Sequence, residues 1–285
     1  MPPRPARDVL VLDLGEYYSP AFASELYLNV DGVARSVKES LRLFLPRTIR
    51  PHRILSGPLR DAIIYTSWHD YPGAILGRTE RPLISWLRRN VRAGETWLDV
   101  GAHYGFTAIA LGGLTGPAGR VFAFEPVARS ADCIRRTMRA NGLDNVRVVD
   151  VGLSDSAEFD TVELPLHRGM ADRTLIGRCT TTETIRHVAL TSIWPELAQG
   201  NPVLHGVKID VQAMEYEVLL GMRPLLACFH PKIVIEFHHG VNREPVLRCL
   251  AECGYALPGN GLSPAPPGAA YPDDESFAFL AEGFR

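Results

Sequence analysis

The residues with the clearest chemical potential lie at a turn between a buried strand and a helix. Residues 97–100 read Trp-Leu-Asp-Val, an apolar run typical of a buried parallel strand, and they carry one acid, Asp99. Gly101 and Gly105 bracket the turn, and an apolar helical pattern starts at Phe106. Glycine lets the backbone approach a ligand closely, and the first turn of a helix offers free N–H groups. The spacing therefore predicts a ligand-binding turn, with Asp99 able to accept a hydrogen bond from a cationic amino group.

A second acid, Glu125, follows the apolar run 121–124 at about the distance where nucleotide-binding folds have a ribose-binding carboxylate. The glycines do not follow the G-x-G-x-x-G pattern of dinucleotide sites, because His103 occupies the position two after Gly101. An ammonium and a ribose without a pyrophosphate describe S-adenosylmethionine, which we predict as the cofactor. The alternative is an ordinary strand–turn–helix with incidental glycines.

Three further candidates lie at the ends of later predicted strands. Asp210 belongs to the strand predicted at 207–211, while Glu236 ends and His238 follows the strand predicted at 232–237. The carboxyl ends of parallel strands meet at one edge of the sheet, where open α/β sheets bind ligands. We therefore predict that these three side chains lie beside the glycine turn and form the catalytic group.

A hydroxyl acceptor would need a general base, and histidine has the ordinary pKa closest to neutrality. His238 is the predicted base and Asp210 would position the acceptor, with His239 and His103 as alternatives. Each histidine could instead be a structural hydrogen-bonding group. The carboxylates and histidines show no recognisable metal-ligand spacing, so we expect a reaction without a metal ion.

Composition limits the class of protein. The 285 residues are 46% hydrophobic with a formal net charge of −2, which predicts a sizeable core and no electrostatic attraction to nucleic acid or anionic membranes. The five cysteines form no CxxC pair, and the apolar run 9–14 is interrupted by Asp13. We expect a cytoplasmic protein with reduced thiols, no membrane insertion and a small-molecule partner. A homodimer is left open.

The chain divides by pattern near residue 92. Residues 1–92 are rich in proline, arginine and aromatic residues and are predicted to form a cap that recognises the substrate, although simple packing would explain them equally well. They include one predicted helix within 17–45, short strands within 54–68 and a helix that starts at Arg81.

Residues 93–285 alternate between strand and helix patterns, which predicts an α/β fold with a Rossmann-like, doubly wound sheet. The remaining predicted elements are strands at 120–124 and 146–151, helices at 128–140, 214–221 and 244–253, and a closing antiparallel pair near 255–257 and 276–280. The polar stretch 155–186 is predicted to be a lid or hairpin at the sheet edge, or else a disordered loop.

Several segments resemble the FkbM-type methyltransferase family, which has the class I S-adenosylmethionine-dependent fold. The resemblance runs from about Ile54 to the C-terminus. The segments that carry it are Leu76-Gly77-Arg78-Thr79-Glu80, 98–105, Phe124-Glu125-Pro126, Gly152-Leu153-Ser154-Asp155 and Lys208-Ile209-Asp210-Val211-Gln212-Ala213-Met214-Glu215. It implies a seven-stranded sheet and methylation of a hydroxyl on a natural product, sugar or lipid-like acceptor.

The resemblance also implies cofactor contacts by position. The matching residues are Asp99, Gly101, Ala102, His103, Tyr104 and Gly105 in the turn, Glu125 and Pro126 at the ribose, and Asp150, Gly152 and Ser154 near the adenine. Two departures concern the acceptor. Gln212-Ala213-Met214 stands where the family usually has Glu-Gly-Ala, and Thr191-Ser192-Ile193 stands where an Asp is usual.

Two other functions remain open from sequence alone. One is a methyltransferase that acts on nitrogen, nucleic acid or protein, although Asn201-Pro202-Val203 is not the motif that gathers a planar amino group. The other is an NAD-dependent oxidoreductase or a catalytically silent binding domain. The glycine spacing argues against the oxidoreductase.

Overall fold

The computed structural model describes residues 42, 44–238, 241–263, 271–281 and 283. The chain divides into two compact units, Met1–Leu45 and Pro46–Arg285. The helix predicted within 17–45 lies almost entirely outside the described residues. The fold described below is that of the second unit, which begins well before the boundary predicted at residue 92. That boundary stays a prediction about function.

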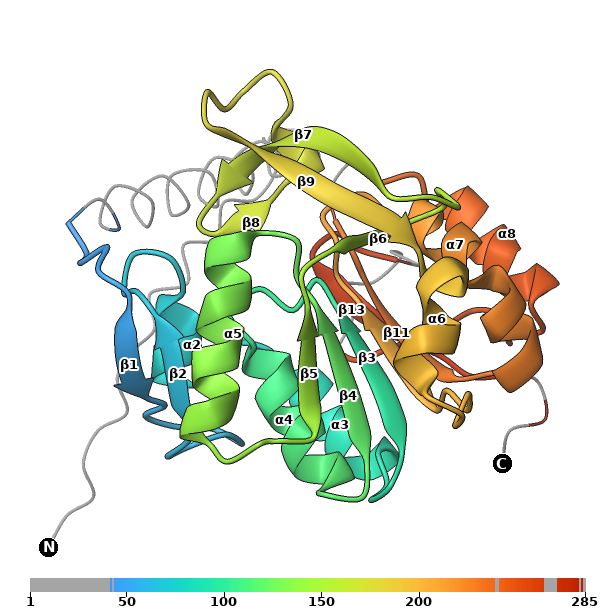
Figure 1. Cartoon of the computed structure of the whole chain (residues 1–285), viewed down its shortest axis with the longest axis horizontal. Helices are drawn as coiled ribbons and strands as arrows, with labels where there is room; N and C mark the ends of the chain where they lie inside the picture. Colours follow the sequence, from blue (N-terminus) through green and yellow to red (C-terminus); the bar gives the residue numbers. More distant parts are fainter. Residues whose placement is uncertain (1–41, 43, 239–240, 264–270, 282, 284–285) are drawn as a thin grey trace, which may run out of the picture. The chain divides into compact units, whose positions relative to one another are not determined.

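A seven-stranded sheet forms the centre of this unit (Figure 1). Its strand order is β12-β13-β11-β10-β3-β4-β5. The strands are β3 (Thr96–Val100), β4 (Arg120–Phe124), β5 (Val146–Val149), β10 (Gly206–Ile209), β11 (Lys232–Phe237), β12 (Asn260–Gly261) and β13 (Glu275–Phe279). Neighbouring strands from β11 to β5 are parallel, and β13 is antiparallel to both its neighbours. The predicted doubly wound sheet of seven strands is confirmed.

Helices cover both faces of the sheet because its central strands are apolar on both sides. In β3, Leu98 packs with the core that includes α6 (Leu190–Ala198), α7 (Glu215–Phe229) and α8 (Arg243–Glu252). Its neighbour Trp97 points to the other face. There it packs with the core that includes α3 (Arg81–Asn90), α4 (Phe106–Thr115) and α5 (Ala128–Ala140). Among the described residues, no helix is long and apolar enough to cross a membrane.

Residues 46–92 pack against the α3–α5 side of the sheet. A hairpin of β1 (Arg50–Arg53) and β2 (Ile63–Thr66) is antiparallel. It is fixed to α5 and the residue after it, because the backbone N–H groups of Ile63 and Tyr65 donate to Asn141 Oδ1 and Thr137 Oγ1, both at 2.9 Å. The short helix α2 (Pro72–Leu76) was not predicted, whereas α3 begins at Arg81 as predicted.

A second sheet contains β6 (Gly152–Ser154), β9 (Thr182–Ala189), β7 (Asp160–His167) and β8 (Met170–Ala171). β7 and β9 are antiparallel, which confirms the hairpin predicted within 155–186. Figure 1 shows this hairpin beyond the arrowheads of β3, β4 and β5. The turn between β7 and β8 is attached to α5, because Ser130 Oγ donates to the carbonyl oxygen of Gly169 at 2.6 Å.

Several predicted boundaries were wrong. β1 lies before the range 54–68 predicted for the first strands, and β10 ends at Ile209 and not at residue 211. Three others have a clear physical cause. The third strand ends at Val149, before residue 151, because β6 pairs with β9 in the second sheet. The helix predicted to end at 221 continues to Phe229 past Pro224, because its buried face continues. The outer strand beside β13 is β12 and not the predicted 255–257. In that segment Tyr255 makes only an isolated bridge with Ala281, and Pro258 has no N–H to donate.

Candidate active site

The conformation of the glycine turn is set by contacts with the ends of the neighbouring strands. Gly101 follows β3 with φ 76°, a left-handed conformation that favours glycine. The N–H groups of Gly101 and Ala102 donate to the carbonyl oxygen of Phe124 at 3.1 and 3.0 Å. A Cβ atom on Gly101 would lie 1.8 Å from the carbonyl oxygen of Asp210. The turn therefore touches the segment after β10 directly.

His103 is held in the middle of the turn. Its φ is 51°, and its ring centroid lies 4.8 Å from that of Tyr71 and 4.3 Å from that of Tyr104. Its Nε2 lies 2.9 Å from the carbonyl oxygen of Arg168 in the β7–β8 turn. Burial lowers the pKa of His103 to about 4, so the ring is neutral and its Nε2–H donates to that carbonyl. His103 is therefore a weak base that joins the turn to the hairpin.

Tyr104 and Gly105 complete the turn from the side of the core. Tyr104 is fully buried, and its hydroxyl donates to Asp70 Oδ2 at 2.9 Å. Asp70 also contacts His69 Nδ1 at 2.9 Å. Gly105 has φ 85°, and a Cβ there would press on the α5 side chain of Ile134 at 3.2 Å. Both residues support the turn, and a direct cofactor contact for either stays a prediction.

Glu125 holds the turn by accepting backbone hydrogen bonds. The backbone N–H of His103 donates to its Oε2 at 2.8 Å, and that of Val127, just beyond Pro126, donates to its Oε1 at 2.9 Å. The residue is 4% exposed, and burial raises the pKa of Glu125 to about 8. Each carboxylate oxygen can accept a second hydrogen bond, so the position remains compatible with ribose hydroxyls.

Asp99 faces a lysine on the neighbouring strand. It lies opposite Lys208 of β10 in register, and it has no exposed surface. Lys208 Nζ lies 3.3 Å from Asp99 Oδ1, 3.5 Å from Asp210 Oδ2 and 3.0 Å from the carbonyl oxygen of Gly101. Burial alone would lower the pKa of Lys208, but the nearby carboxylates raise it above its usual range. Lys208 is thus a fixed cation that ties the turn to β10, and the predicted contact of Asp99 with a cofactor amino group remains untested.

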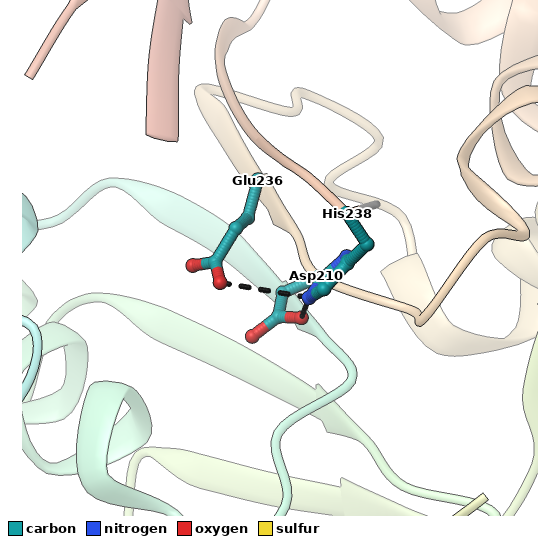
Figure 2. A group of neighbouring side chains, drawn as sticks. All are labelled: Asp210, Glu236 and His238. Carbon is teal, nitrogen blue, oxygen red and sulfur yellow. Dashed lines mark ion pairs between the residues drawn. The ribbon is translucent and has the colours of Figure 1, made fainter. Parts of the chain in front are cut away.

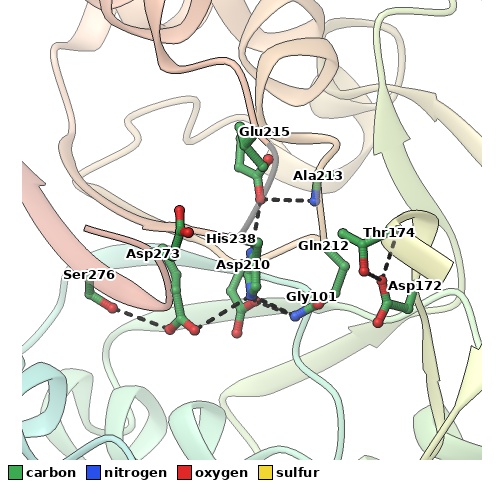
Figure 3. A network of polar contacts seen from close by, with 12 residues as sticks. Gly101, Asp172, Thr174, Asp210, Gln212, Ala213, Glu215, His238, Asp273 and Ser276 are labelled. Atoms are coloured by element: carbon green, nitrogen blue, oxygen red, sulfur yellow. Dashed lines mark hydrogen bonds and ion pairs between the residues drawn. The ribbon is translucent and has the colours of Figure 1, made fainter. Parts of the chain in front are cut away.

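The predicted catalytic residues lie together. His238 Nε2 lies 3.4 Å from Asp210 Oδ1 and 3.5 Å from Glu236 Oε1 (Figure 2). On the other side of the ring, Nδ1 lies 3.3 Å from Glu215 Oε1 (Figure 3). His239 lies outside the described residues. The carboxyl ends of β10 and β11, together with the first residue of α7, therefore bring one histidine and three carboxyl groups together.

The charge state of His238 differs from that of a general base. Burial alone would lower its pKa, but the hydrogen bond to Glu215 and the charges of Asp210 and Glu236 raise the pKa of His238 to about 9. At neutral pH both ring nitrogens then carry protons. In this state His238 donates protons, and its predicted role as the base requires a change in its surroundings.

Two residues from the segment before residue 93 reach this region and were not predicted. Glu80 precedes α3 with φ 53°, and burial together with the charge of Asp210 raises the pKa of Glu80 to about 7. Tyr71 is half-buried, and its pKa is raised by burial and by nearby Glu80, Asp210 and Glu236. Glu80 is the last residue of the segment 76–80 that resembles the family, and this resemblance could have identified it as a site residue.

Gln212 and Ala213 form the loop after β10 with φ 53° and 75°. The amide nitrogen of Gln212 lies 2.7 Å from His238 Nε2 and 3.3 Å from Asp210 Oδ1. The family usually has glycine where this chain has Ala213, so the left-handed backbone is kept without the residue that favours it.

The residues predicted near the adenine are separated by the structure. Asp150 is exposed after β5 and forms an ion pair with Arg135. Gly152 and Ser154 belong to β6 in the second sheet. Ser154 is 2% exposed, and its Oγ lies 2.8 Å from His187 Nδ1. Asp150 thus has the most accessible side chain among them.

Comparison with known proteins gives a family match. The model of the methyltransferase FkbM domain matches residues 99–257. The chain resembles a solved FkbM methyltransferase from Methylobacillus flagellatus KT with TM-score 0.45 and 16% identity, covering 69% of this chain and 50% of that one. It thus spans half the length of that protein. No curated protein matches the chain.

Two other solved structures are similar at the same level. A SAM-dependent methyltransferase from Aquifex aeolicus has TM-score 0.38 and 15% identity, covering 70% of this chain and 88% of that one. Aeropyrum pernix fibrillarin, solved with natively bound S-adenosyl-L-methionine, has TM-score 0.44 and 13% identity, covering 82% and 89%. The family match extends over more than half of the sequence, and the chain therefore belongs to the FkbM methyltransferase family, with the seven-stranded sheet of class I methyltransferases.

Proposed function

We propose that this chain transfers a methyl group from S-adenosylmethionine to a hydroxyl group of a small molecule. The observation that carries the proposal is the contact between the glycine turn and the catalytic group. Gly101 packs on the backbone of Asp210, and Lys208 bridges the Gly101 carbonyl and the Asp210 carboxylate. A cofactor bound at the turn would therefore present its methyl group beside Asp210, Glu236 and His238.

The charges near the turn suit this cofactor, which carries a sulfonium and an ammonium group. Carboxyl groups outnumber basic groups among the described side chains at this edge. The acids are Glu80, Asp99, Asp210, Glu215 and Glu236, and the basic groups are Lys208 and His238. A cation bound there would favour the ionised forms of Glu80 and Glu236, whose pKa values are raised to about 7 and about 8, whereas a pyrophosphate would disfavour them. The residues present therefore fit S-adenosylmethionine better than a dinucleotide.

When bound, the cofactor would supply a methyl carbon on a positively charged sulfur. Transfer forms an O–C bond and breaks the C–S bond, whose electron pair stays on sulfur. The acceptor hydroxyl loses its proton. The chain contributes mainly position, because a displacement of this kind depends on alignment. Lys208 and Glu125 fix the turn, and the carboxyl groups of Asp210 and Glu236 orient the acceptor hydroxyl.

The proposal includes acceptor recognition by the residues before 93. Tyr71 and Glu80 support it, because the charge of nearby Asp210 helps to raise the pKa of both side chains. Glu80 is the better test, since Tyr71 also stacks on His103 and a change there would disturb the cofactor turn. We expect Glu80→Gln to weaken acceptor turnover more than cofactor binding.

A cytoplasmic location is also part of the proposal, supported by five cysteines that are all free thiols.

The experiment is a screen of hydroxyl-bearing and amine-bearing compounds with S-adenosylmethionine labelled with 13C in its methyl group. The chemical shift of the transferred carbon distinguishes an O-methyl from an N-methyl product. We expect labelled methyl groups on oxygen. Label on nitrogen would contradict the acceptor class. Binding of cofactor with no transfer to any compound of either class would favour a silent binding domain.

A further inference from the structure

Three donor atoms of the catalytic group are spaced as the ligands of one cation. One ligand atom each from Asp210, Glu236 and His238 lie within 4.8 Å of one another. The contacts of His238 Nε2 with the two carboxylate oxygens are 3.4 and 3.5 Å (Figure 2). Ligand atoms about 2.1 Å from a metal ion lie roughly 3.0–3.4 Å apart in octahedral and tetrahedral geometry. The two separations that involve His238 are therefore close to those around a bound ion, and the Asp210 and Glu236 oxygens lie no more than 4.8 Å apart.

The orientation of His238 is an independent observation. Glu215, the first residue of α7, is 1% exposed and holds His238 Nδ1 at 3.3 Å from its Oε1. The backbone N–H of Ala213 donates to the same oxygen at 3.2 Å and fixes the carboxylate (Figure 3). A histidine that ligates a metal through one nitrogen almost always donates the other N–H to such a group. Glu215 therefore directs Nε2 toward Asp210 and Glu236.

Each of the other two ligands also has an outer contact. Lys208 Nζ lies 3.5 Å from Asp210 Oδ2 and leaves Oδ1 facing His238. Ser276 Oγ donates to Glu236 Oε2 at 3.4 Å, while Oε1 faces His238. Outer contacts of this kind orient metal ligands and are part of a built site. The three donor atoms are thus each held from behind by a different element of the fold.

We propose that Asp210, Glu236 and His238 bind one divalent cation that holds the acceptor hydroxyl. The proposal deepens the methyl-transfer function above and rests on it. Two carboxylates and an imidazole suit Mn²⁺, which accepts both donor types. Three protein ligands leave positions for the hydroxyl and water, and a cation lowers the pKa of an oxygen bound to it. The hydroxyl would then lose its proton to water, and its oxygen would bond to the methyl carbon as the C–S bond breaks and leaves its electron pair on sulfur.

This site revises the metal-free reaction expected from the sequence. Glu236 and His238 are only two residues apart, but Asp210 follows the adjacent strand β10 and is separated from them in sequence by α7, so the sequence shows no complete ligand motif. The Gln212 amide, 2.7 Å from His238 Nε2, must move when the ion binds. Gln212 lies in the loop after β10, so β11, which supplies Glu236, need not move.

The test is a titration of Mn²⁺ into the chelator-treated full chain, followed by the electron paramagnetic resonance signal of free Mn²⁺. We expect one bound ion per chain. His238→Ala and the conservative Glu236→Gln should each weaken binding at least about tenfold. Glu196→Gln, at an exposed carboxyl on α6, is the matched control and should leave binding unchanged.

Thermal unfolding and calorimetric binding of S-adenosylmethionine by the same samples separate the possible failures. The proposal is overturned if the wild-type chain binds no Mn²⁺, or if a folded His238 or Glu236 variant binds it as tightly as the wild type. Cofactor binding without Mn²⁺ binding would refute the metal site alone. Mn²⁺ binding without cofactor binding would refute the proposed function instead.

Discussion

Replacing Lys208 by methionine should destabilise the fold much more than removing an exposed ion pair. Lys208 is 4% exposed, and its Nζ lies 3.3 Å from Asp99 Oδ1, 3.5 Å from Asp210 Oδ2 and 3.0 Å from the Gly101 carbonyl oxygen. Methionine preserves most of the side-chain length but removes the charge. Asp99, which has no exposed surface, would then be a buried acid without its cation.

The expected loss follows from that stranded charge. Removing one partner of a buried ion pair costs about 3–5 kcal/mol, because the remaining charge has neither water nor a counter-ion. The Gly101 carbonyl also loses its donor, which costs about 1–3 kcal/mol and partly overlaps with the first effect. Adding Asp99→Asn to Lys208→Met removes the stranded carboxylate. The double variant should therefore be more stable than Lys208→Met alone.

The assay is urea unfolding at neutral pH, followed by circular dichroism. The control is Arg223→Met, which breaks the ion pair with Glu252 at 2.9 Å between side chains that are 50% and 47% exposed. An exposed pair contributes only about 0–1 kcal/mol. The reasoning is refuted if Lys208→Met costs no more than Arg223→Met. It also fails if Asp99→Asn destabilises the Lys208→Met background further.

Two other predictions concern the supports of the sheet. Burial alone would raise the pKa of Glu95, but hydrogen bonds, first that from Lys232 at 2.8 Å, lower it below its usual range. The stability that Glu95 contributes is therefore fully present above about pH 4.3, the pKa of an unfolded glutamate, and is lost as the pH falls through the lower pKa of the folded state. The urea midpoints of the wild type and of Glu95→Gln should therefore converge toward about pH 3. Gly101→Ala should cost clearly more than Gly94→Ala. At both positions φ is positive, which costs an alanine about 1–2 kcal/mol, but only at Gly101 would the new Cβ meet the backbone of Asp210. Equal unfolding free energies of the two variants would contradict this.

Local patterns were sufficient for much of the fold. The bounds of β4, α5 and β11 agree with the sequence prediction, because each is an uninterrupted apolar or amphipathic run with clear ends. The misplaced ends depend on distant partners. β5 stops where β6 joins another sheet, and α7 continues past Pro224 because its buried face remains covered.

The site was predictable where it depended on topology and not where it depended on side-chain pairing. Asp210, Glu236 and His238 lie together because the carboxyl ends of parallel strands meet at one edge. The pairing of Asp99 with Lys208 depends on the register of β3 against β10, which a strand pattern does not contain. The approach of Glu80 likewise depends on how α3 docks.

The central claim is that the glycine turn and Glu125 bind S-adenosylmethionine, and calorimetric titration of the cofactor tests it most directly. Glu125→Gln is preferable to Glu125→Ala, since Ala would leave both N–H groups, of His103 and Val127, without an acceptor, whereas Gln keeps one acceptor oxygen. Gln replaces one acceptor oxygen by a donor, so we expect a loss of about 1.5–3 kcal/mol, or roughly tenfold to a hundredfold in affinity, in a variant that thermal unfolding shows to be folded. Absence of cofactor binding by the wild-type chain, or equal affinity in the folded variant, would contradict the account.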